Sequence, residues 1–241
     1  HRQFSQELQL LGSALDDRLQ YILGAYLFTE RANQTEDYDA GAFVISNRKV
    51  RARNKAQALF ANLTYAIAPT LKLTVGGRYS WDQRRAVKDN IDFTIPDPIA
   101  GVPPFAFVGT GKRSFSKFNP SGTLTWQPSD DLNVYAKVVT GYRSGGYGTG
   151  SASKADFERG FDEENLISYE AGLKFTGWDR RLQFNSAFFY SNYKDILIDL
   201  AVLGAPQFVA SFNAGKARIY GAELDLSLLP VDSLRLDFSY A

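Results

Sequence analysis

Acidic side chains gather in one stretch of the chain, where they could hold a metal ion. Asp156, Glu158, Asp162, Glu163 and Glu164 lie close together in the sequence. Carboxylate oxygens are the ligands that hard cations such as Ca²⁺ prefer. The spacing is not that of an EF-hand, and a charged loop in water has the same composition. We therefore expect a solvated loop here and predict no metal and no cofactor.

Two glycine-rich segments invite comparison with nucleotide-binding loops. Gly109–Ser114 contains a Gly-Lys pair, but a phosphate loop needs glycine at position 106 and Ser or Thr at 113. Those positions hold Ala106 and Arg113, so the match fails. Gly141–Ser151 has five glycines, yet no helix follows that would present its N-terminus to a phosphate. We interpret it as flexible backbone that leaves a strand for an outer loop.

Catalytic constellations find little support in this composition. The chain has no cysteine, and its one histidine is His1, which argues against a Ser-His-Asp triad and against Cys- or His-ligated zinc. Residue type alone leaves a glycosidase pair of carboxylates open, but nothing singles out a pair. Charges nearly balance, with 27 basic and 26 acidic residues, which argues against nucleic acid as a partner. We predict that the protein is not an enzyme.

Alternation along Leu71–Asp82 predicts a strand with one apolar and one polar face. Such a strand suits either a soluble sheet with a dry core or a membrane barrel with lipid outside and a wet lumen. No apolar run approaches the roughly 20 residues of a membrane helix. Similar alternation, weaker in the first four, predicts about ten strands in all, the others at 3–11, 19–30, 54–67, 115–127, 132–139, 168–175, 182–191, 220–228 and 234–240.

The connections between these strands alternate in length. Short polar turns are predicted at 13–18, 68–70, 128–131, 177–181 and 230–233, and connections of about twenty residues or more at 31–53, 83–114, 143–163 and 194–212. If the strands run up and down, all short turns lie on one side. That asymmetry is typical of outer-membrane barrels, with short periplasmic turns and long extracellular loops.

Aromatic residues, 14% of the chain, sit where a bilayer would meet water. Tyr21, Tyr65 and Trp126 lie beside short turns, and Tyr79 and Trp81 lie toward a long connection. This placement favours two aromatic belts, although the core of a soluble β-sandwich would also contain such residues.

Four segments, in order along the chain, resemble motifs of TonB-dependent receptors. Val134–Tyr147 contains the run G-Y-R-S-G-G-Y, and Glu164–Lys174 contains S-Y-E-A-G-L-K. Phe188–Ile196 reads F-F-Y-S-N-Y-K-D-I, and Asn213–Leu224 begins N-A-G-K-A and ends G-A-E-L. The resemblance implies an all-β, antiparallel up-and-down transmembrane barrel of 22 strands. It also implies an N-terminal plug and a TonB box, on which the TonB complex pulls to release ligand inward.

No plug or TonB box is recognisable in these residues, and about ten strands is fewer than 22. We expect residues 1–241 to be a single partial barrel domain, truncated at both ends, in the outer membrane of a Gram-negative bacterium. The expected partners are outer-membrane lipid, the TonB complex through a missing N-terminal region, and a small-molecule ligand. The expected function is uptake of a scarce large nutrient, such as an iron–siderophore, another metal complex or a glycan. A passive pore of another family and a soluble carbohydrate-binding sandwich are the alternatives.

The alternation assigns side chains to the two faces of the expected barrel wall. Candidates for the lipid face are Leu71, Leu73, Val75, Tyr79 and Trp81, and candidates for the lumen are Lys72, Arg78, Lys137, Glu170, Lys174 and Glu223.

Overall fold

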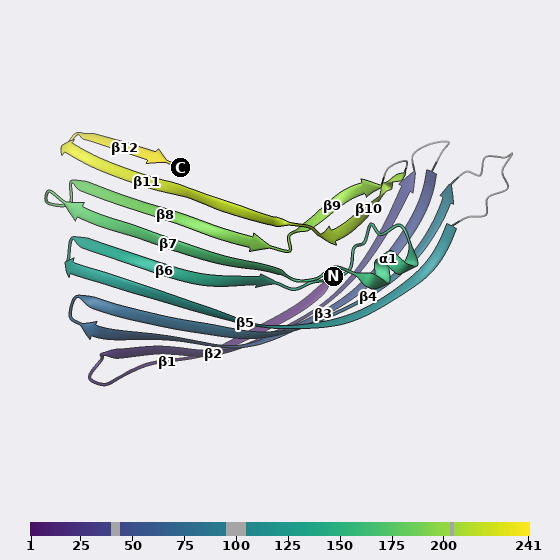
Figure 1. The fold of residues 1–241 in the computed structure, drawn as a ribbon, viewed down its shortest axis with the longest axis horizontal. Coiled ribbons are helices and arrows are strands. Elements are labelled where there is room, and N and C mark those ends of the chain that lie inside the picture. Colours follow the sequence, from purple (N-terminus) through teal and green to yellow (C-terminus); the bar gives the residue numbers. More distant parts are fainter. Residues whose placement is uncertain (40–43, 95–104, 203–204) are drawn as a thin grey trace.

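One curved antiparallel sheet makes up most of the chain in the computed structural model, which describes residues 1–39, 44–94, 105–202 and 205–241 (Figure 1). Each strand pairs with its neighbour in sequence, except that β8 pairs with β11, because β9 and β10 form a separate hairpin. The strands are β1 Arg2–Ala14, β2 Leu19–Asp39, β3 Val44–Ala68, β4 Leu71–Thr94, β5 Phe105–Ser129, β6 Leu132–Arg143, β7 Glu164–Gly177, β8 Leu182–Lys194, β9 Leu197–Val202, β10 Ala205–Asn213, β11 Lys216–Val231 and β12 Leu234–Tyr240.

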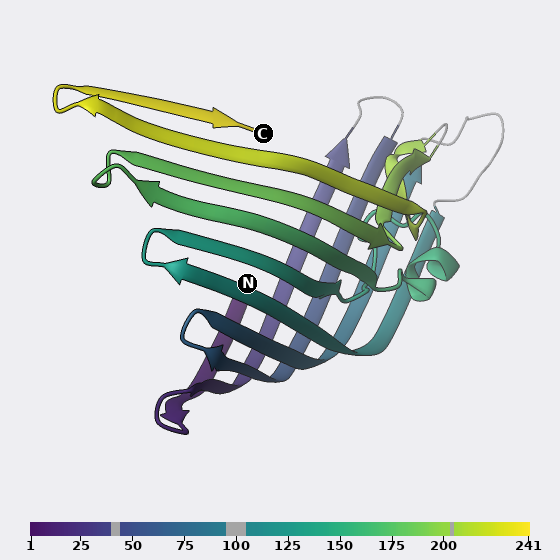
Figure 2. The same cartoon turned by 60° about the vertical axis from the view of Figure 1, so that its left-hand side comes forward.

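The sheet curls into an open trough. In Figure 2, β1–β4 pass behind β6–β8 and β11, and the strand order ends in two edges, β1 and β12. All the short turns lie at one end of the trough, and the longer connections lie at the other, which we call the loop end (Figure 1). The predicted up-and-down β architecture is therefore confirmed, and a two-layered sandwich is not seen among the described residues.

Register across the sheet separates two faces. In β4, Arg78 lies opposite Phe60 on one side and Asn119 on the other, whereas Tyr79 lies opposite Leu59 and Phe118. We call the face that carries Arg78 the inner face and the face that carries Tyr79 the outer face. Large hydrophobic side chains are exposed along the outer face of most strands; they include Leu8, Leu23, Leu63, Leu73, Val75, Tyr79, Trp81, Phe118, Trp126, Tyr169, Phe188, Tyr220 and Phe238.

The strands are longer than the alternation predicted. Strands occupy most of the two connections expected at 31–53 and 83–114. In the first, β2 continues to Asp39 and β3 begins at Val44; in the second, β4 continues to Thr94 and β5 begins at Phe105. Both faces mix polar and apolar residues in these extensions, so the hydrophobic period disappears while backbone pairing continues. The connections at 143–163 and 194–212 instead contain the short helix α1, Lys154–Arg159, and the β9–β10 hairpin.

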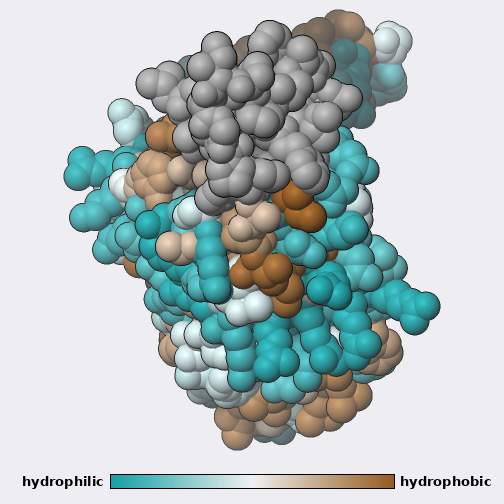
Figure 3. Space-filling model, turned by 90° about the vertical axis from the view of Figure 1, so that its right-hand side faces the viewer, coloured by the Kyte–Doolittle hydropathy of each residue, from teal (hydrophilic) through white to brown (hydrophobic). Residues whose placement is uncertain are grey.

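Most buried residues gather at the loop end, although Ala58, Ser80 and Asp82, nearer the middle of the sheet, are buried too. Val50, Ala86, Lys88 and Asn90 of β3 and β4 are buried there, together with Phe157 of α1. Viewed from the loop end, the surface is mostly hydrophilic around a small hydrophobic cluster (Figure 3). Within the described ranges, no helix is long and apolar enough to cross a membrane.

Candidate functional site

Residues 144–163, which we call the inner loop, lie on the inner face of β4 and β5. Phe157 of α1 is completely buried against Gly109, where an added Cβ would stand 2.6 Å from its ring. Tyr147 covers Gly111 in the same way, since an added Cβ there would stand 2.1 Å from its ring. The ring centres of Tyr147 and Phe157 are 5.5 Å apart. Since Gly109 and Gly111 alternate on one face of β5, they form two neighbouring sockets. Close packing, not phosphate binding, explains these glycines.

The short helix that carries Phe157 is capped at both ends. The Ser153 hydroxyl accepts a hydrogen bond from the Asp156 N–H at 3.1 Å, as an N-cap does. Gly160 follows the last helical residue with φ of +64°, a conformation that glycine adopts without strain. The capped turn fixes where Phe157 points, so a six-residue helix is enough to position one anchor.

Basic side chains of β4 and β5 bind the inner loop. Arg84 donates to the Ser144 hydroxyl at 2.6 and 2.9 Å and pairs with Asp82 at 3.0 Å. Buried Lys88 donates to the Ser151 carbonyl at 2.6 Å. Arg113 donates to the Phe161 carbonyl at 2.8 Å and pairs with Asp162, and Lys117 pairs with Glu163 at 3.0 Å. Four cations in this part of the wall therefore fasten the loop along its length.

The acidic cluster that the sequence places here is part of this attachment. Besides Asp162 and Glu163, Asp156 pairs with Arg159, Glu158 accepts from the Thr110 N–H at 3.1 Å, and Glu164 pairs with Arg143 at 3.2 Å. The expectation of a merely solvated loop is wrong, because these carboxylates bind basic side chains and backbone groups. Within the described ranges, no group of three or more metal-ligating acids or histidines is arranged to hold an ion.

Four of the five glycines of 141–151 are also packed closely. An added Cβ at Gly145 would lie 2.2 Å from the Phe161 carbonyl, and one at Gly150 would lie 2.8 Å from Val209 of β10. Gly146 pairs with Phe161 in an isolated β-bridge. These small residues let the inner loop touch residues 161–162 and the hairpin, a packing role that the interpretation as flexible backbone did not include.

Glu164, at the first position of β7, joins the inner loop to the β9–β10 hairpin. It is buried, and its carboxylate accepts from the Leu197 N–H at 2.5 Å and the Tyr193 hydroxyl at 2.8 Å. Burial by itself raises the pKa of Glu164, but these hydrogen bonds and the Arg143 charge outweigh it, so the pKa lies below its ordinary value. The residue lies five positions beyond exposed Tyr169, toward the loop end.

We expect Glu164→Gln to loosen the hairpin by about 1–3 kcal/mol, because a charge-assisted network is replaced by weaker neutral bonds. Because folding lowers the pKa, the stabilisation is present above the unfolded value of about 4.3 and is lost as pH falls through the folded value. The protection factors of residues 197–202 and 209–213, which correct for the slower intrinsic exchange at low pH, should therefore fall below about pH 4.3 in the parent protein. The same pH step should change little in Glu164→Gln, and an equal response in both proteins would contradict this role.

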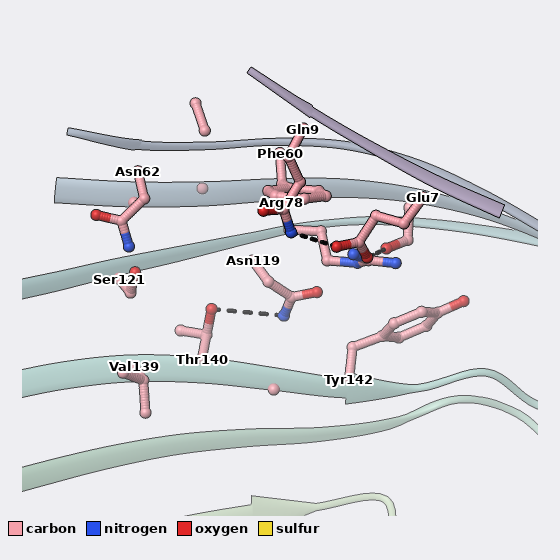
Figure 4. Close-up of a pocket in the computed structure, with 15 residues that line it drawn as sticks. Glu7, Gln9, Phe60, Asn62, Arg78, Asn119, Ser121, Val139, Thr140 and Tyr142 are labelled. Carbon is pink, nitrogen blue, oxygen red and sulfur yellow. Dashed lines mark hydrogen bonds between the residues drawn. The ribbon is translucent and has the colours of Figure 1, made fainter. Parts of the chain in front are cut away.

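A cavity of about 610 Å³ lies on the inner face, nearer the middle of the sheet than the inner loop (Figure 4). Arg78 lies on its wall, with its guanidinium 5.3 Å from the Tyr26 ring centre and 5.8 Å from that of Phe60, and it donates to the Ser80 hydroxyl at 3.1 Å. Further polar side chains that line the cavity are Glu7, Gln9, Asn62, Asn119, Ser121 and Thr140. The wall thus offers one cation, Arg78, one carboxylate, Glu7, aromatic faces and neutral hydrogen-bonding groups.

All six residues predicted for the lumen share the inner face, but they do not form one site. Lys137 pairs with Glu170 at 2.9 Å, and the Tyr135 hydroxyl also donates to Glu170 at 2.8 Å. Arg78 lines the cavity, whereas Lys72, Lys174 and Glu223 are exposed elsewhere on the face. The five residues predicted for the lipid, Leu71, Leu73, Val75, Tyr79 and Trp81, share the outer face.

Sequence reasoning missed the residues that attach the inner loop. Arg84, Lys88 and Lys117 were not singled out, and neither were the anchors Tyr147 and Phe157. The pair Gly109 and Gly111 on one strand face was a usable signal, because glycine inside a strand often marks close approach of another group.

Comparisons with known proteins agree on one family. The family described as "TonB dependent receptor-like, beta-barrel" matches residues 2–241. The pesticin receptor of Yersinia pestis is 25% identical over 227 residues, which cover 93% of this chain and 31% of that receptor. The chain therefore spans about a third of the length of the curated relatives that it matches.

Two solved structures show the same fold. The ferric yersiniabactin uptake receptor FyuA from Yersinia pestis matches with a TM-score of 0.77 at 22% identity, covering 98% of this chain and 34% of that one. The hemophore receptor HasR of Serratia marcescens, solved with its hemophore HasA and heme, matches with a TM-score of 0.61 at 16% identity. That match covers 98% of this chain and 47% of HasR.

Proposed function

Because the chain belongs to the TonB-dependent receptor family, we propose that it is part of the barrel wall of a receptor that takes up a scarce metal chelate, such as an iron–siderophore complex. Members of this family are outer-membrane proteins of Gram-negative bacteria, and we assign the chain to that membrane. The observation that carries the proposal is the family match over residues 2–241. Energy for uptake would come from the TonB complex, acting on parts of the receptor outside this chain.

The two faces of the sheet fit the two surroundings of such a wall. In this proposal the outer face, with Leu73 and Val75, contacts lipid, and the inner face, with Lys72 and Arg78, faces the lumen. Exposed aromatic side chains near both ends of the strands, Tyr65 and Trp126 toward the turns and Tyr79, Trp81 and Tyr169 toward the loops, would lie at the two membrane interfaces.

The loop end supports a role in ligand capture. The inner loop and the β9–β10 hairpin fold over the polar wall there, and the Arg78 cavity lies on the same face. A guanidinium beside two aromatic rings suits a ligand that carries both acidic and aromatic groups. Metal chelates of the siderophore class combine such groups. The structural relatives support this class, because FyuA is an uptake receptor for ferric yersiniabactin and HasR was solved in complex with heme.

Uptake in cells tests this function. The full-length receptor is expressed in a strain that lacks it, and cells receive radiolabelled ferric yersiniabactin or heme. We expect receptor-dependent accumulation of at least one probe, abolished by a protonophore. Receptor-dependent accumulation that survives the protonophore would favour a passive pore. Receptor-dependent accumulation of neither probe would reject iron-chelate uptake.

A further inference from the structure

Five basic residues stand side by side across the outer face near the loop end. Arg2 of β1 lies opposite Arg31 of β2, Arg31 opposite Arg53 of β3, Arg53 opposite Arg85 of β4, and Arg85 opposite Lys112 of β5. All five are exposed. We call this set the basic row. The residues are scattered over the first half of the sequence, and only strand register brings them together.

No acidic side chain lies in the rows next to it on this face. Toward the turns the neighbours are Phe4, Thr29, Lys55, Gln83 and Ser114, and toward the loops they are Asn33, Arg51, Val87 and Thr110. Among the residues that the structure describes, the side chains of the basic row make no salt bridge. The two adjacent rows add two further cations, Lys55 and Arg51.

On the inner face, by contrast, cations that lie opposite each other have acidic partners. Arg84 and Arg113 also lie directly opposite each other, but Asp82 pairs with Arg84 and Asp162 pairs with Arg113. Like charges directly opposite each other in a sheet are destabilising unless a counter-charge is present. On the outer face the chain supplies no acid in these rows, so the basic row is open to an anion from outside the sheet.

The position of the basic row along the strands indicates its surroundings. Arg85, the member of the row in β4, follows the exposed Trp81 by four residues, or about 13 Å along the strand. In an outer-membrane wall, aromatic side chains at this position mark the interface, and the next level is that of the lipid headgroups. Arginine binds phosphate through two parallel hydrogen bonds, which makes it suited to phosphorylated headgroups.

We propose that the basic row binds the phosphates of the phosphorylated glycolipid in the outer leaflet. The bound headgroups neutralise the row and hold lipid against β1–β5, on the opposite side of the wall from the inner loop. This site is independent of the transported ligand.

The test uses the full-length receptor in detergent and diphosphorylated lipid A as probe, with binding measured by native mass spectrometry. The triple variant Arg31→Gln, Arg53→Gln and Arg85→Gln should bind about a hundredfold more weakly, since each basic residue near an anionic surface contributes roughly a factor of five. The same lipid A without its phosphates should bind the parent as weakly as the variant does. Inorganic phosphate at equal concentration should not displace the lipid.

A matched variant removes three positive charges elsewhere: Lys72→Gln, Lys174→Gln and Arg180→Gln. It should bind like the parent, and the charge-preserving variant Arg31→Lys, Arg53→Lys and Arg85→Lys should fall in between. If the triple Gln variant does not fold, as judged by heat-modifiable migration, Arg53→Gln alone should still show about a fivefold loss. Equal binding by parent and Gln variants, equal loss in the matched variant, or equal binding of dephosphorylated lipid would overturn the proposal.

Discussion

Val75→Arg should lower the free energy of unfolding of the receptor in a bilayer by about 2–4 kcal/mol, because a charge on the lipid face of a barrel is costly near the midplane. Val75 is 52% exposed on the outer face of β4. It lies on the turn side of Tyr79 and Trp81, in the stretch between the two sets of aromatic side chains. Refolding into liposomes, followed by denaturant titration with heat-modifiable migration as readout, measures the loss.

Thr74→Arg is the matched control on the other face of the same strand. Thr74 shares a hydrogen bond of 2.9 Å with Thr64, whose loss costs about 1 kcal/mol, but an arginine there enters a polar surface. We therefore expect Thr74→Arg to be clearly milder than Val75→Arg. Equal losses in the two variants, or a larger loss for Thr74→Arg, would contradict the assignment of the faces.

Phe157→Ala should release the inner loop from the wall. Phe157 is completely buried over Gly109, and truncation of such a side chain costs about 3–5 kcal/mol. The ion pairs of Arg113 and Lys117 are partly exposed, so they do not replace a buried anchor. Hydrogen exchange across 144–163 should accelerate strongly, while exchange in β7 and β8 stays slow.

Lys154→Ala tests the same helix without touching its anchor. Lys154 is exposed, and its ion pair with Glu158 spans 4.0 Å, so exchange in the inner loop should change little. Unchanged exchange in Phe157→Ala would show that the loop is held in another way.

Alternation predicted the sheet well only where the two faces differ in polarity. Leu71–Asp82 was identified because Leu73 and Val75 oppose Lys72 and Thr74 in chemistry. Beyond Trp81 that difference fades: Gln83 and Arg85 on the outer face are as polar as Arg84 on the inner face. The extensions of β2–β5 therefore looked like loops, although the pairing of β2 with β3, β3 with β4 and β4 with β5 continues through them.

The inner loop could not be predicted because its contacts are distant in sequence. Phe157 meets Gly109 and Arg84 meets Ser144, and neither contact leaves a local period. The acidic residues were noticed, but their partners Arg113 and Lys117 belong to a strand about 46 to 49 positions earlier. The basic row has the same character, since its members become neighbours only when five strands are in register.

Spin-label accessibility along β4 tests most directly whether the outer face lies in lipid. The 241 residues contain no cysteine, so single cysteines at 72, 73, 74 and 75 each carry one label within this chain. In the full-length receptor in liposomes, labels at 73 and 75 should collide with oxygen dissolved in the lipid, and labels at 72 and 74 should collide with a water-soluble nickel reagent or be shielded from both. Lipid accessibility at 72 and 74 instead would contradict the account.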